Sequence, residues 1–132
     1  MEIPGQNITN LLFEYAQWKR ELYFWQNELE RIYNRLGELT TRYTSLDVLS
    51  MLEYYQNDFI LHGSDIEELL VAIQEFELNM AGHISAGNVR VEPQLAVEHA
   101  ALMKRMEVQR KIGANLKMEF YRFLSKYDAI CP

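Results

Sequence analysis

The feature that most constrains the fold of this chain is an unbroken series of apolar and aromatic residues near its N-terminus. These residues recur at alternating steps of three and four positions, which is the spacing of one face of a long helix packed at a shallow crossing angle. We therefore predict a helix over about residues 7–41. The eleven positions of this stripe are Ile8, Leu11, Tyr15, Trp18, Leu22, Trp25, Leu29, Ile32, Leu36, Leu39 and Tyr43.

Two further segments continue the same periodicity. A stripe from Val48 to Met80 predicts a second helix over about residues 46–81, and His62 is its single polar member. A weaker stripe from Leu95 to Tyr127 predicts a third helix over about residues 93–127. Three members interrupt this last stripe, namely His99, Gln109 and Gly113.

The links between the three stretches determine the expected topology. The first link is short, so the second helix must run back antiparallel to the first. The second link contains Gly82 and Gly87, and Pro93 suits the first turn of the helix that follows. We predict a single all-α domain over residues 1–132, an up-down-up antiparallel bundle of three long helices with coiled-coil-like packing. Dimerisation is one way in which such a bundle is completed.

Composition excludes several functional classes. The chain has 132 residues, of which 48% are apolar and 24% charged, as in ordinary globular proteins. A net charge of −6 argues against nucleic-acid binding, which needs a basic surface. No apolar run is long enough for a membrane span, and the N-terminus has no secretory character. Cys131 is the only cysteine, so we expect a cytoplasmic protein without a disulfide framework.

The charges are unevenly distributed along the chain. No lysine or arginine occurs between Tyr43 and Val89, where eight acidic residues lie, whereas eight basic residues oppose five acidic ones from Arg90 onward. We expect the acidic second helix to pack beside the basic third helix.

Reflecting each helix through its turn predicts one unusual layer at the middle of the bundle. Trp25 is expected beside His62 and Gly63, with Gly113 opposite. We expect the two glycines to make room for the indole, which would explain two weak helix formers at mid-bundle.

Candidate chemistry is sparse. Helical bundles that bind two iron ions carry Glu-x-x-His pairs on two helices, and this sequence has none. His62 is expected to be a hydrogen-bonded core histidine or a pH-sensitive weak point of the core, and not a ligand. His83 and His99 are candidates for a metal or small-ligand site near the second link, together with Glu77 and Glu98. No nucleophile elbow or phosphate-binding loop occurs, so these residues neither support nor exclude an enzyme, and no cofactor is predicted.

Three large side chains of the first helix fall outside its stripe, namely Phe13, Tyr23 and Phe24. Either they form a surface for a homodimer or a partner helix, or the core is wider than the stripe.

The aromatic-rich stretches 53–60 and 120–124 resemble small bacterial helical proteins that have no assigned activity. In outline the chain also resembles ferritin-like and hemerythrin-like bundles. It lacks the metal ligands that define those groups, so the resemblance implies none of their chemistry. We expect a non-enzymatic structural or protein interaction module that acts through a helical surface. The alternative is a divergent bundle that binds a small ligand or a metal near His83 and His99.

Overall fold

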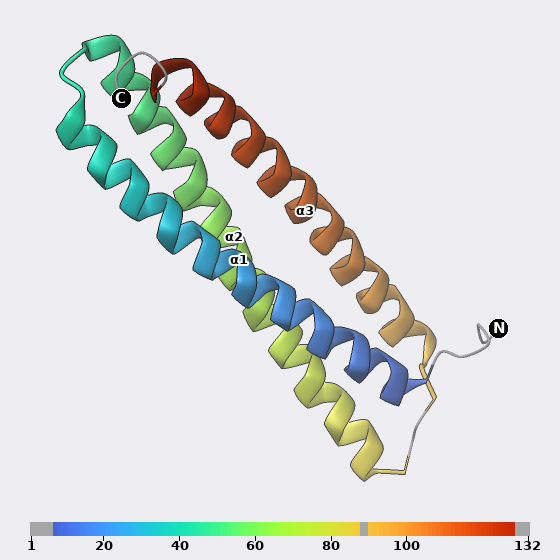
Figure 1. Cartoon of the computed structure of the whole chain (residues 1–132). Helices are drawn as coiled ribbons and strands as arrows, with labels where there is room; N and C mark the ends of the chain where they lie inside the picture. The colour runs from blue at the N-terminus through green and yellow to red at the C-terminus, as the bar shows by residue number, and fades with distance from the viewer. Residues whose placement is uncertain (1–6, 88–89, 129–132) are drawn as a thin grey trace.

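Three long helices make up nearly all of the structure that is described. The computed structural model describes residues 7–87 and 90–128, the side chain of Asp128 excepted, so Cys131 lies outside the described residues. The helices are α1 (Ile8–Arg42), α2 (Leu46–Ser85) and α3 (Pro93–Asp128). They run up, down and up (Figure 1), which confirms the predicted all-α bundle.

The helix ends follow from local chemistry. Asn7 caps α1, since its side chain accepts a hydrogen bond of 2.9 Å from the backbone N–H of Asn10. Pro93 is the first residue of α3, as predicted. The predicted end of α2 at residue 81 was wrong, because the helix continues through Gly82 to Ser85. Gly87 instead provides the turn, with a φ of 83° that favours glycine.

The predicted stripes form the core. In α2 every stripe position from Val48 to Met80 is buried, including His62. Nine of the eleven positions of the first stripe are buried, and Trp25 and the C-cap residue Tyr43 pack partly buried against the core. The interruptions in the third stripe also point inward, since His99 and Gly113 are buried and Gln109 is partly buried.

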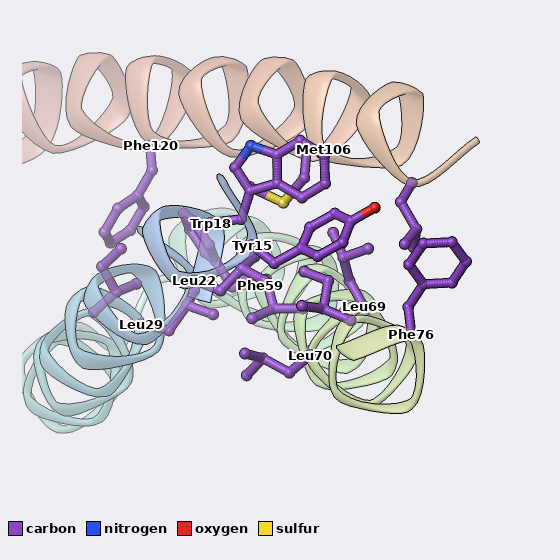
Figure 2. Close-up of a cluster of buried hydrophobic side chains, with 14 of the residues drawn as sticks. Tyr15, Trp18, Leu22, Leu29, Phe59, Leu69, Leu70, Phe76, Met106 and Phe120 are labelled. Atoms are coloured by element: carbon purple, nitrogen blue, oxygen red, sulfur yellow. The ribbon is translucent and has the colours of Figure 1, made fainter. Parts of the chain in front are cut away.

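The helix α2 supports both of its neighbours. The backbone of α2 packs closely against α1 and against α3, whereas α1 and α3 meet mainly through long side chains. In Figure 2 the indole of Trp18 reaches from α1 to α3 beside Met106, and Tyr15 lies next to it. This separation of α1 from α3 creates the space in which the polar groups described below lie.

None of the described helices is both long and apolar enough to cross a lipid bilayer.

Two adjacent residues of α2 test the assignment of the core. Phe59 is fully buried and its ring packs edge-on against Phe120, whereas Ile60 is half exposed. We expect Phe59→Ala to lower the free energy of unfolding by about 3–5 kcal/mol and Ile60→Ala by less than about 1 kcal/mol. Urea unfolding followed by circular dichroism measures both, and equal losses would contradict the assignment.

Candidate functional site

The middle of the bundle contains a buried polar network centred on His62. The side chain of His62 is 5% exposed, and its Nδ1 lies 2.9 Å from Oε1 of Gln109. The amide nitrogen of Gln109 in turn donates to Oδ2 of Asp65 over 3.4 Å. Because this bond orients the amide, Nδ1 of His62 is the protonated nitrogen and donates to Gln109, which leaves Nε2 as an acceptor.

Burial determines the charge of this imidazole. Loss of solvent lowers the pKa of His62, and Lys117 acts in the same direction, while the bond to Gln109 and the charge of Asp65 oppose them. His62 is therefore neutral near pH 7.

The sequence suggested that the two mid-bundle glycines make room for the indole of Trp25. In the structure each glycine lies against a different side chain. A Cβ at Gly113 would lie 2.8 Å from Nε2 of His62, so Gly113 makes room for the imidazole. A Cβ at Gly63 would lie 3.0 Å from the hydroxyl of Tyr33, which donates to the carbonyl of Phe59. Trp25 does lie near His62, with a centroid separation of 6.2 Å.

A cavity of about 230 Å³ opens beside this network, between α1 and α3. Apolar side chains from α1 and α2 form part of its wall, and Arg110 and Lys117 reach it from α3. The residues that line it are Trp25, Glu28, Leu29, Ile32, Phe59, His62, Arg110, Gly113, Ala114 and Lys117.

Ion pairs connect α1 to α3 along the cavity. Arg110 donates to both carboxylate oxygens of Glu21, over 2.8 and 2.9 Å. Two helical turns further along, Lys117 donates to Glu28 over 3.1 Å. The acidic α2 does pack beside the basic α3, as expected, but Arg110 and Lys117 of α3 form their ion pairs with α1.

A second polar group surrounds His99, which is 3% exposed. Its ring stacks on Trp18 with an interplanar angle of 4°, and Nδ1 lies 2.6 Å from the hydroxyl of Tyr15. Burial raises the pKa of Tyr15, so the hydroxyl stays protonated and donates to Nδ1. Burial also lowers the pKa of His99, against the opposing charge of Glu14.

The second ring nitrogen of His99, Nε2, is less well paired than Nδ1. Nε2 lies 3.5 Å from a carboxylate oxygen of Glu14 and makes no hydrogen bond with the described residues. Since Nδ1 accepts from Tyr15, Nε2 carries the hydrogen. Burying a donor that lacks a hydrogen bond has a cost in free energy.

His83 lies half-buried in the last turn of α2, and within residues 7–87 and 90–128 no group of three or more histidine, cysteine, aspartate or glutamate side chains is placed to hold a metal ion.

The three large residues outside the stripe of α1 are exposed. Phe13 is 64% exposed, Phe24 56% and Tyr23 46%, so the structure does not place them in a wider core.

Sequence reasoning located both buried histidines but missed their partners and the ion pairs. One available signal was the seven-residue spacing of Glu14, Glu21 and Glu28, which Arg110 and Lys117 repeat on α3.

No protein family, curated protein or solved structure matches this chain.

The two buried histidines predict that stability depends on pH. The pKa of each is lowered in the folded protein, whereas a histidine in the unfolded chain titrates near about 6.5. Below that pH the unfolded state takes up protons that the folded state does not, so stability falls. We expect the midpoint of thermal unfolding to fall by roughly 5 °C between pH 7 and pH 5.

The control for this prediction is the double variant His62→Gln, His99→Gln. Its unfolding midpoint, followed by circular dichroism, should change less over the same pH range. An equal change in both proteins would assign the pH dependence to other groups.

Substitution of Gly113 tests the packing around His62, and substitution of Gly37 is the control. Gly113→Leu places its side chain against the imidazole and should lower the free energy of unfolding by about 1–3 kcal/mol. Gly37 has open space around a Cβ, so Gly37→Leu should be neutral or stabilising by up to about 1 kcal/mol, because leucine favours the helix. Chemical denaturation compares the two, and an unchanged stability in Gly113→Leu would contradict the close contact.

Proposed function

We propose that this protein is a non-enzymatic interaction module that forms a homodimer through one face of α1. The observation that carries the proposal is the exposure of aromatic side chains in a charge-poor surface. We name this surface the outer face of α1 and define it by the exposed residues within positions 8–28, which are Thr9, Asn10, Phe13, Gln17, Arg20, Tyr23, Phe24 and Asn27.

The composition of the outer face favours an interface. Arg20 is its only charged residue, and three of its eight members are aromatic. The cores of protein interfaces are depleted of charge and enriched in aromatic residues and arginine. Burying Phe13 and Phe24 against a partner would remove apolar surface from water, which is the main driving force for association.

The order of residues on the outer face suits a second copy of the same chain. In a twofold-symmetric dimer the same surface pairs with itself, and such dimers are the commonest oligomers. If two α1 helices cross antiparallel at the midpoint between residues 18 and 19, Phe13 of each copy lies opposite Phe24 of the other. Arg20 then lies opposite Gln17, so like charges do not face each other directly.

Removing both phenylalanines tests the dimer. We expect sedimentation to show a dimer at micromolar concentrations for the wild type. The double variant Phe13→Ser, Phe24→Ser should raise the dimer dissociation constant by about 30-fold or more, because central aromatic residues dominate interface energies. Both side chains are exposed, so the monomer should keep its fold.

The matched control is Leu78→Ser, since Leu78 is an exposed apolar residue of α2, at 74% exposure, away from the outer face of α1. It should leave the dissociation constant unchanged. A wild type that stays monomeric, or a control that dissociates as readily as the double variant, contradicts the proposed interface.

A further inference from the structure

The cavity between α1 and α3 has the size of a site for a small organic molecule. Its volume is about 230 Å³. A water molecule takes about 30 Å³ of liquid, and an apolar cavity of about 150 Å³ is known to admit benzene. The cavity is therefore large enough for one aromatic ring with a small polar substituent.

Its lining has two chemically different parts. Leu29 and Ile32 of α1 and Phe59 of α2 provide apolar surface, and the indole of Trp25 adds an aromatic surface. Arg110 and Lys117 provide positive charge from α3. A pocket with apolar walls and few polar groups binds a ligand whose apolar body and polar end match that division.

The polar groups of the lining favour a ligand that accepts hydrogen bonds. Arg110 and Lys117 are cationic, but their ion pairs with Glu21 and Glu28 balance those charges, and His62 is neutral near pH 7. The ion pairs with Glu21 and Glu28 use only some of the N–H groups, since guanidinium has five and ammonium three. The remaining donors can bind a carboxylate without breaking either pair.

Gly113 keeps this space open. It lines the cavity and lies against His62, so a larger side chain there would meet the imidazole and take up room. Mid-helix glycine costs about 1 kcal/mol relative to alanine. Gly113 thus accommodates the imidazole and leaves the adjoining cavity volume unfilled.

We propose that this cavity binds a small aromatic carboxylate, with its ring beside Trp25 and its carboxylate at Lys117 and Arg110. This site does not depend on the proposed dimer, because it lies between α1 and α3, whereas the outer face of α1 points away from the bundle.

Calorimetric titration with benzoate tests the site, with benzamide and acetate as comparison compounds. Benzoate should bind with a dissociation constant of about 1 mM or lower. Benzamide lacks the charge and acetate lacks the ring, so each should bind at least about tenfold more weakly. Benzoate should also shift the indole N–H signal of Trp25 and the amide signal of Gly113 in NMR spectra more than the indole signal of Trp18.

Two substitutions, each with a matched control, locate the binding. Lys117→Gln removes one positive charge of the lining and should weaken benzoate binding about tenfold or more. Lys111→Gln, on an exposed position of α3, is its control and should bind as the wild type does. Ala114→Leu fills the cavity from an exposed helical position and should abolish binding with the fold retained, whereas Ala100→Leu, two heptads earlier, should not.

The proposal is overturned if benzoate does not bind, or if it binds no better than benzamide. Unchanged binding in Ala114→Leu, with its fold intact by circular dichroism, would also overturn it.

Discussion

The arrangement of α1 and α3 on a common support governs the other features of this protein. Both helices pack on α2, and the space between them is spanned by side chains. At one end Tyr15 and Trp18 span it by contacting His99. At the middle, Gly113 contributes no side chain beyond the backbone, and a cavity remains. The ion pairs of α1 with α3 lie beside that cavity. The cavity and the ion pairs therefore both follow from the separation of these two helices.

The two buried histidines contribute specificity at some cost in stability. Apolar contacts are not directional, so a striped helix tolerates small shifts along its axis, whereas a hydrogen bond requires defined distances and angles. His62 bonds to Gln109 and thereby links α2 to α3. His99 bonds to Tyr15 and links α3 to α1. The cost is visible at His99, whose second nitrogen makes no hydrogen bond within the described part of the chain. Both rings remain neutral because the loss of solvation on charging them inside the bundle outweighs the favourable interactions with their neighbours.

The first helix has two faces with different compositions. Its inner stripe holds the fold together, and the glutamates beside that stripe meet the basic side chains of α3. Its outer face is aromatic and nearly uncharged over the first half of the helix, which a solvated surface does not require. The proposed dimer and the proposed ligand therefore use opposite sides of one rigid element. Association through the outer face would leave the cavity residues in place.

The sequence by itself determined the three helices, their antiparallel order and the residues that point inward, because apolar spacing along a helix is a local property of the chain. It even placed His62 and His99 in the core. Only the tertiary structure decided that Gly113 accommodates His62, that Gly63 faces Tyr33, and that Arg110 and Lys117 pair with α1. The tertiary structure also decided that α2 continues past Gly82. A single glycine weakens a helix without ending it. The physical reason is that these contacts join residues far apart in the chain, and their distances depend on helix separation and side-chain rotamers, which a periodic pattern does not encode.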